Sequence, residues 1–306
     1  MNNSQKIFDF YVKKEILLEN SLSQFVESVL YFPQIGVELE FYLLDKNLQR
    51  LQSQSLVDDY IYSFLQLVVN DDKIYKVEKE QGISQIEIKI APHDNLLDLA
   101  KKILNIKEVA KNLAQKNQYI ACFDAQPFID DCGSALQFNF SLHDIDGSNL
   151  FAKKIEQKLM MYSIAGMIDS IDWAMVFYAP QEKDYLRFNK EINHNLHKKG
   201  KFTAPVNISY GYDNRTAAIR VPYVKKDVGA ENNIYKNARI EFRVPSANAD
   251  PFLVMTSLLI AISHAISVCK LPQDSHKVFG NAFDEKYLLQ NFADNLQIAE
   301  NNFLNH

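Results

Sequence analysis

The sequence predicts an α+β protein, and two observations support this class. Four segments alternate apolar and polar residues with a period of two, as strands with one buried and one polar face do. Between them lie longer segments whose apolar residues recur at helical spacing. With 306 residues, 47% of them apolar, the chain can bury a large core as one big domain or two modest ones.

Helical periodicity places the predicted helices along the whole chain. The segments are, approximately, residues 12–31, 55–69, 94–116, 152–178 and 251–269. Pro33 and Gly36 mark the entry into the first strand, and Pro180 ends the fourth helix because proline cannot continue one. Residues 181–204 turn to Lys, Asn, His and Glu, which predicts an exposed loop. The polar tail is expected to be helical in part.

The four predicted strands carry acids, amides and arginines on their polar faces. They are GVELEFYLLD (36–45), EQGISQIEIKI (80–90), SALQFNFSLH (134–143) and ARIEFRVP (238–245). Burying an ion costs several kcal/mol unless it is paired or binds a metal. A sheet face that bears both acids and arginines therefore suggests metal ions together with an anionic ligand.

Each strand taken alone has a simpler interpretation. The Arg-x-Glu-x-Arg pattern at residues 239–243 could be a cross-strand ladder of salt bridges on a solvated face. Glu38 and Glu40 could equally belong to a polar sheet face, and Gln137, Asn139 and Ser141 to solvent-facing alternation. Only the joint occurrence of these segments in one chain favours a metal- and anion-binding site over solvated strand faces.

Composition excludes several classes of function. The net charge of −5 argues against nucleic acid as the main partner. No apolar run reaches the roughly 18 residues of a membrane span, so no membrane partner is expected. The N-terminus lacks the segments of a secretory signal, which makes a cytoplasmic location the expectation.

Cysteine and glycine patterns narrow the chemistry further. The three cysteines are far apart and lack CxxC spacing, which removes a disulfide framework and a thiolate metal site. A nucleophilic Cys132, which precedes Gly133 in a loop, stays open as a minor alternative. There is no GxxxxGK[ST], because Phe202 follows Gly200-Lys201, and no GxGxxG. Any ATP site must therefore be built from metals and arginines.

The order of these motifs resembles the catalytic domain of glutamine synthetases and related ATP-dependent carboxylate-amine ligases. The resemblance runs in register from about Gly36 to Leu253. GVELEFYLLD is similar to the family's first metal strand, residues 80–87 to EYGPGQFE, 121–128 to ATFMPKPF, 133–139 to GSGMHVH, 180–188 to PTVNSYKRL, 213–222 to NRSASIRIP, and 239–243 to RIEVR. Single pieces are weak signals, but their common order is a strong one.

The resemblance implies a particular architecture within the α+β class. It implies a curved, largely antiparallel sheet that forms a funnel, with helices packed outside. Residues 1–32 would be an N-terminal helical segment and residues 33–306 the catalytic domain. The family's N-terminal β-grasp domain is expected to be missing, because thirty-odd residues cannot hold it. A homo-oligomer is expected by analogy.

The resemblance also assigns a metal to each of two ligand sets. Glu40, Glu80 and Glu87 would hold one divalent ion, and the second would be held by Glu38, Gln137 and Glu241. Oxygen-only ligation suits Mg²⁺ or Mn²⁺. Because Gln137 stands where the family has a histidine, the second ion is expected to bind more weakly.

The remaining site residues are assigned by the same resemblance. ATP would contact Arg215, Arg220, Arg239, Asn139 and Ser141, and the acid substrate would contact Arg187, Arg243, Cys132 and Gly133. Arg215, Arg220 and Thr203 would be catalytic. Guanidinium forks match the geometry of phosphate and carboxylate oxygens.

The implied reaction joins a glutamate-like acid to an amine through an acyl phosphate. Thr203 replaces the glutamate that helps glutamine synthetases bind and deprotonate ammonium, which favours an amine other than ammonia. An extra segment from Asn189 to about Lys198 supplies Glu191, His194 and His197, and a neutral imidazole there could act as a base. Two alternatives stay open: a catalytically impaired member that binds nucleotide or a partner, and a phosphotransferase like the guanidino kinases.

Overall fold

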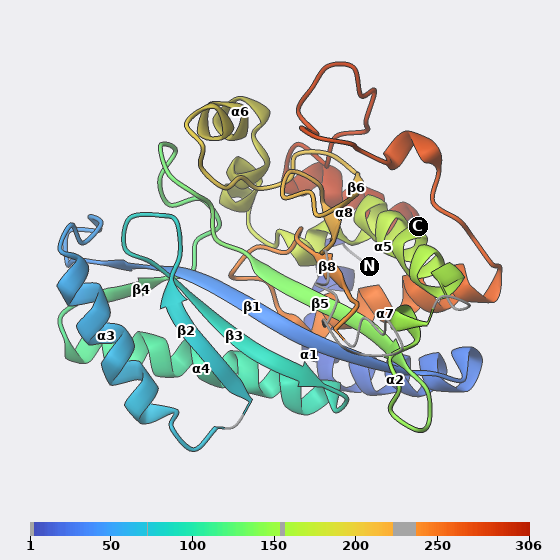
Figure 1. Ribbon diagram of the computed structural model, residues 1–306, viewed down its shortest axis with the longest axis horizontal. Helices are drawn as coiled ribbons and strands as arrows, with labels where there is room; N and C mark the ends of the chain where they lie inside the picture. The colour runs from blue at the N-terminus through green and yellow to red at the C-terminus, as the bar shows by residue number, and fades with distance from the viewer. Residues whose placement is uncertain (1–2, 72, 154–156, 223–236) are drawn as a thin grey trace, which may run out of the picture.

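The computed structural model describes residues 3–71, 73–153, 157–222 and 237–306 (Figure 1). Within these residues the strands form one open eight-stranded sheet in the order β2-β3-β1-β5-β8-β7-β6, with β4 paired to β1. All pairings are antiparallel except that between β6 and β7. The predicted α+β class and the largely antiparallel sheet are confirmed.

Four of the strands are those that the period-two alternation predicts. The strands are β1 (Phe32–Leu44), β2 (Ile74–Lys79), β3 (Gln85–His93), β4 (Ile120–Cys122), β5 (Leu136–His143), β6 (Tyr210–Tyr212), β7 (Ile219–Val221) and β8 (Ile240–Phe242). Strand β1 begins at Phe32, four residues before Gly36, whereas Glu80 lies in the turn before β3. Strands β4, β6, β7 and β8 have three residues each, and of these only β8 was predicted, because the alternation extends beyond it over residues 238–245.

The five predicted helices are present, and the tail is helical in part as expected. The helices are α1 (Asn3–Val12), α2 (Lys14–Val29), α3 (Gln54–Leu67), α4 (Leu96–Lys116), α5 (Gln157–Tyr178), α6 (Lys190–Lys198), α7 (Pro251–Ser267) and α8 (Leu296–Asn305). Short 3₁₀ turns are η1 (Leu150–Ala152), η3 (Glu182–Phe188) and η4 (Asp274–His276). Among the described helices, none has the length and apolarity needed to cross a membrane.

The prediction of an exposed loop at residues 181–204 is wrong. This stretch contains η3 and α6, and Asp184, Arg187, Asn193 and Leu196 are buried. The polar residues are buried because they have partners: the Asp184 carboxylate accepts from the backbone N–H of Gln181 and from the Asn248 amide, each at 2.9 Å. Composition indicates polarity but does not reveal such partners.

Helices cover one face of the sheet and bury the apolar side chains of its strands. Figure 1 shows α2, α4 and α7 on one side of the sheet, with α6 beyond the other side. Leu39, Phe138 and Phe242 are fully buried, and Leu18 and Phe25 of α2 belong to the same core. The division of the chain at residue 32 stays a prediction.

The strand register gathers the polar side chains into a row on the opposite face. Glu38 of β1 lies opposite Lys89 of β3 and Gln137 of β5, and Glu40 lies opposite Glu87. The row continues across the sheet with Asn139 opposite Glu241, and Glu241 opposite Arg220. Since neighbouring strands lie about 4.8 Å apart, these charges interact directly.

Candidate active site

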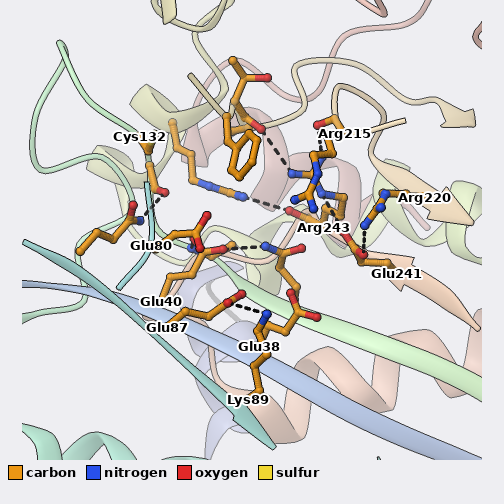
Figure 2. A pocket seen from close by; sticks show the side chains of 18 of the residues that line it. Glu38, Glu40, Glu80, Glu87, Lys89, Cys132, Arg215, Arg220, Glu241 and Arg243 are labelled. Carbon is orange, nitrogen blue, oxygen red and sulfur yellow. Dashed lines mark hydrogen bonds and ion pairs between the residues drawn. The ribbon is translucent and has the colours of Figure 1, made fainter. Parts of the chain in front are cut away.

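A cavity of about 310 Å³ lies against the polar face of the sheet (Figure 2). Five carboxylates line it, namely Glu38, Glu40, Glu80, Glu87 and Glu241. Six cationic side chains line it too: Lys89, Arg187, Arg215, Arg220, Arg239 and Arg243. The acids that the sequence singled out thus converge from β1, the β2–β3 turn, β3 and β8 instead of scattering over the surface.

The acids of β1 and β3 are held close together on the cavity floor. One Glu40 oxygen accepts from the Gln137 amide at 2.6 Å and the other from the Ala135 backbone N–H at 2.9 Å. Burial, and then the Glu80 charge, raise the pKa of Glu40 to about 7. Burial and the charges of Glu38 and Glu40 raise the pKa of Glu87 to about 9. Such a concentration of negative charge attracts a cation.

The donor set fits a hard divalent ion. Carboxylate oxygens dominate it, and Oε1 of Gln137 is buried without a hydrogen-bond partner. Mg²⁺ and Mn²⁺ prefer oxygen ligands of these kinds. Among the described residues, no three His, Cys, Asp or Glu side chains already stand together at ligand spacing. Their oxygens instead contact neighbouring protein groups, as the Glu87 carboxylate contacts Lys89 at 2.9 Å.

Lys89 is a site residue that the sequence analysis missed. Its ammonium bridges Glu87 at 2.9 Å and Glu78 of β2 at 3.0 Å, and these contacts raise its pKa against the opposing effect of burial. The signal was present, since Lys89 follows Glu87 by two residues and therefore shares its face of β3. It was overlooked because a lysine on a strand is commonly a solvated edge residue.

Two of the five arginines are largely engaged with the main chain. Arg187 donates to the backbone carbonyls of Val244 at 2.7 Å and Arg243 at 3.0 Å. Arg243 pairs with Glu241 at 3.1 Å and donates to the carbonyls of Arg215 and Ala217. Both side chains line the cavity, and the Nε–H of Arg187 is buried without a hydrogen-bond partner.

The other arginines differ in how much of each guanidinium is available. Arg220 pairs with Glu241 at 2.8 Å and with Asp213. Arg239 donates to the Asn139 amide oxygen at 2.9 Å. The Arg215 guanidinium stacks on the Phe202 ring at 4.5 Å and has no carboxylate or carbonyl acceptor among the described residues. Arg215 is therefore the arginine whose donors are most available to an anionic ligand.

A second cavity of about 500 Å³ adjoins the first, and both are lined by Glu38 and Arg239. Asn139 and Ser141 line this second cavity and not the first. The Asn139 amide donates to the Glu38 carboxylate at 3.1 Å, so it connects the carboxylates of the main cavity to the second cavity. Tyr75 supplies an aromatic surface there.

Thr203, Cys132 and Gly133 line the main cavity, and their roles stay predictions. Burial and the neighbouring Asp131 carboxylate raise the pKa of Cys132 to about 12, which keeps it a thiol and speaks against a nucleophilic role. His194 and His197 lie on α6, outside both cavities, and the His197 ring packs edge-on against Phe283 at 5.7 Å. The structure does not bring these histidines to the site.

Comparison with known proteins identifies the family. The family model for the catalytic domain of glutamine synthetase matches residues 64–303. The chain belongs to the glutamine synthetase family. Glutamine synthetase from Sulfolobus acidocaldarius is 32% identical over 171 residues, which are 54% of this chain and 33% of that protein.

Two relatives within the glutamine synthetase family match a larger share of the chain. γ-Glutamylputrescine synthetase PuuA of Escherichia coli is 28% identical over 283 residues, covering 84% of this chain and 56% of the relative. Glutamate–isopropylamine ligase of a Pseudomonas species is 27% identical over 282 residues, covering 84% and 57%. The chain therefore spans little more than half the length of these relatives.

Two solved structures share the fold. A structure of GmaS in complex with ADP superposes with a TM-score of 0.79 at 20% identity, covering 96% of this chain and 68% of that one. Apo GmaS gives a TM-score of 0.76. At this level of identity the similarity describes the arrangement of the backbone.

Proposed function

We propose that the protein is an ATP- and divalent-metal-dependent ligase that joins the side-chain carboxylate of a glutamate-like acid to an organic amine. The observation that carries the proposal is the convergence of five buried or half-buried carboxylates with five arginines in one cavity. The names of two relatives, γ-glutamylputrescine synthetase and glutamate–isopropylamine ligase, support the reaction class.

Glu40, Glu80 and Glu87 would hold one ion, and Glu38, Gln137 and Glu241 the second. The unpartnered carbonyl oxygen of Gln137 supports its part in this assignment. When bound, the ions would neutralise charge on the transferring phosphoryl oxygens and on the leaving ADP. The second cavity, with Asn139 and Ser141, would take the nucleoside, because it adjoins the charged cavity at Arg239.

The reaction has two steps. A carboxylate oxygen of the acid attacks the γ-phosphorus of ATP, the bond to the bridging oxygen breaks, and ADP leaves an acyl phosphate behind. The neutral amine then attacks the acyl carbon, the carbon–oxygen bond to phosphate breaks, and the nitrogen loses a proton to the departing phosphate or to water as the amide forms. Arg215 and Arg220 would place their N–H donors against the oxygens that carry the developing charge.

One feature of the cavity wall and the names of two relatives support an organic amine over ammonia. The wall beside Cys132 and Gly133 is formed by Phe202, Thr203 and Ala204, none of which is charged. An amine in its uncharged, nucleophilic form would leave water for such a surface at less cost than an ammonium ion. The two relatives that match 84% of the chain are named for organic amines.

The proposal is tested by measuring ADP release from ATP, glutamate and Mg²⁺ or Mn²⁺ in the presence of ammonia, isopropylamine or putrescine, with mass spectrometry of the products. We expect a γ-glutamyl amide with at least one organic amine. ATP binding in a calorimeter without any amine-dependent ADP release would instead identify a nucleotide-binding module. Phosphorylated product without amide would identify a phosphotransferase. Light scattering on the same sample tests the expected homo-oligomer.

A further inference from the structure

Residues 200–204, hereafter the wall segment, form the uncharged side of the main cavity without belonging to any helix or strand. Phe202, Thr203 and Ala204 face the cavity, and Thr203 and Ala204 are buried. A segment without secondary structure has no ladder of backbone hydrogen bonds to hold it in place. The N–H groups of Gly200 and Lys201 bond to the last carbonyls of α6, at 2.9 and 3.0 Å. From Phe202 onward the segment is held by side chains of other segments.

Asn193 of α6 provides the buried anchor of the wall segment. Its amide oxygen accepts from the backbone N–H of Ala204 at 2.8 Å. Its amide nitrogen donates to the backbone carbonyls of Arg187 at 2.7 Å and Asn189 at 2.9 Å. Asn193 is only 1% exposed, so these hydrogen bonds do not compete with water. One side chain thus joins the wall segment to the 3₁₀ turn η3 that carries Arg187.

Two further contacts hold the other end of the wall segment. The Lys201 ammonium pairs with the fully buried Asp131 carboxylate, which also accepts from Arg50 at 3.2 Å. The Gln81 amide accepts from the Phe202 N–H and donates to the Gly200 carbonyl at 3.2 Å. Gln81 is itself exposed, so the water-shielded contacts are those of Asp131, Asn193 and Arg243, whose guanidinium donates to the Thr203 carbonyl at 3.4 Å.

We propose that Asn193 is a positioning residue for amine binding: it fixes the wall segment, through Ala204, at the distance from Arg187 that the amine requires. This inference rests on the proposed ligase function. In this proposal α6 contributes to the site through the buried amide of Asn193, and not through the imidazoles of His194 or His197. A displacement of about 1 Å in such a wall is enough to reduce productive binding by one or two orders of magnitude.

The kinetic test compares Asn193→Ala with Asn195→Ala, a matched variant of an exposed asparagine on the same helix. For Asn193→Ala we expect the KM for the amine to rise by about tenfold or more while the KM for ATP stays within about twofold. Asn195→Ala should behave as wild type. Equal rises in both KM values, or no change in either, would overturn the proposal.

Lys201→Met provides an independent variant should Asn193→Ala fold poorly. It releases the wall segment from Asp131, which keeps Arg50 and the backbone N–H groups of Ile83 and Cys132 as partners. The same selective rise in the KM for the amine is expected. An unchanged KM in Lys201→Met would mean that the position of the wall segment does not control amine binding.

Hydrogen–deuterium exchange tests the anchor without any turnover. In Asn193→Ala the amide of Ala204 should exchange at least about tenfold faster than in wild type, because its acceptor is gone. Asn195→Ala should leave that rate unchanged. If the wild-type protein releases no ADP with any amine, the proposed function fails. An unchanged exchange rate at Ala204 in Asn193→Ala would instead show that Asn193 does not anchor the wall segment.

Discussion

At the scale of single residues, the site contains groups that oppose folding. Glu87 is buried beside Glu38 and Glu40, and its pKa of about 9 means that the fold disfavours its charge. A protein selected only for stability would place an uncharged side chain there, since a buried carboxylate costs free energy that Lys89 offsets only in part. Such a residue is expected where a ligand needs its charge.

Replacing Glu87 should therefore separate stability from activity. In Glu87→Gln we expect metal-dependent ATP turnover to fall by at least about 100-fold, while the melting temperature without metal stays equal to wild type or rises. ADP release and thermal unfolding in a chelator measure the two effects. The matched control is Glu78→Gln, because Glu78 also contacts Lys89 but lies outside the cavity. Retained turnover in Glu87→Gln, or the same loss in Glu78→Gln, would refute the metal assignment.

The arginines offer a second contrast at the residue scale. Arg215→Met should lower turnover by at least about 100-fold with little change in stability, because within the described part of the chain its guanidinium contacts only the Phe202 ring. Arg187→Met should cost about 2 kcal/mol or more of stability, because two backbone carbonyls lose their donors. Chemical denaturation and ADP release distinguish these roles. A destabilised Arg215→Met with normal turnover would reverse the assignment.

At the scale of elements, helix α4 buries a lysine in the face that packs against the rest of the protein. Lys107 is buried beside the Phe123 ring, and its ammonium donates to the Ala249 carbonyl at 3.2 Å. Burial, opposed by Asp250, lowers the pKa of Lys107 to about 7, and the charges of Lys14 and Lys111 act in the same direction as burial. Helix α4 therefore packs against the start of α7 with a lysine that prefers to be neutral.

This lysine makes stability depend on pH in a defined direction. Between about pH 7 and the ordinary lysine pKa of about 10.5, the unfolded chain binds a proton that the folded protein does not, so stability rises with pH. Each pH unit contributes up to about 1.4 kcal/mol. We expect Lys107→Met to raise stability most at or below pH 7, with the gain vanishing toward pH 10.

Denaturation midpoints at several pH values measure the difference between wild type and variant. Lys101→Met is the control, since Lys101 lies on α4 with its ammonium paired at the surface to Glu15 at 3.3 Å and is not among the charges that shift the pKa of Lys107. It should show little dependence on pH. A constant difference between Lys107→Met and wild type over the whole range would contradict the lowered pKa.

At the scale of the whole molecule, cation binding should stabilise the fold, because the acids that repel one another come from four separate segments. We expect Mn²⁺ or Mg²⁺ to raise the melting temperature, with about 2.7 kcal/mol of stabilisation at a concentration 100 times the dissociation constant. Thermal unfolding with increasing Mn²⁺ measures this. Glu87→Gln should lose most of the shift, and equal shifts in both proteins would place the ion elsewhere.

The sequence predicted more of the sheet than of the contacts made by its side chains. Period-two alternation was enough to find β1, β3, β5 and β8 and to place Glu38, Glu40 and Glu87 on one face. Glu80 lies in a turn, where no periodicity exists, so only the family resemblance located it. The burial of Asn193 and Leu196 on α6 was missed because an amphipathic nine-residue helix with two histidines has the composition of a surface loop.

The sequence by itself determined which face of each strand is polar, because side chains on a strand alternate between its two faces whatever the rest of the fold does. It also determined the kind of ligand, since carboxylates and guanidiniums in one row suit metals and phosphate. Only the tertiary structure decided which of these groups are available. Arg187 is engaged with carbonyls of a distant strand end and Asn193 with the wall segment, and such partners depend on where remote segments meet in space.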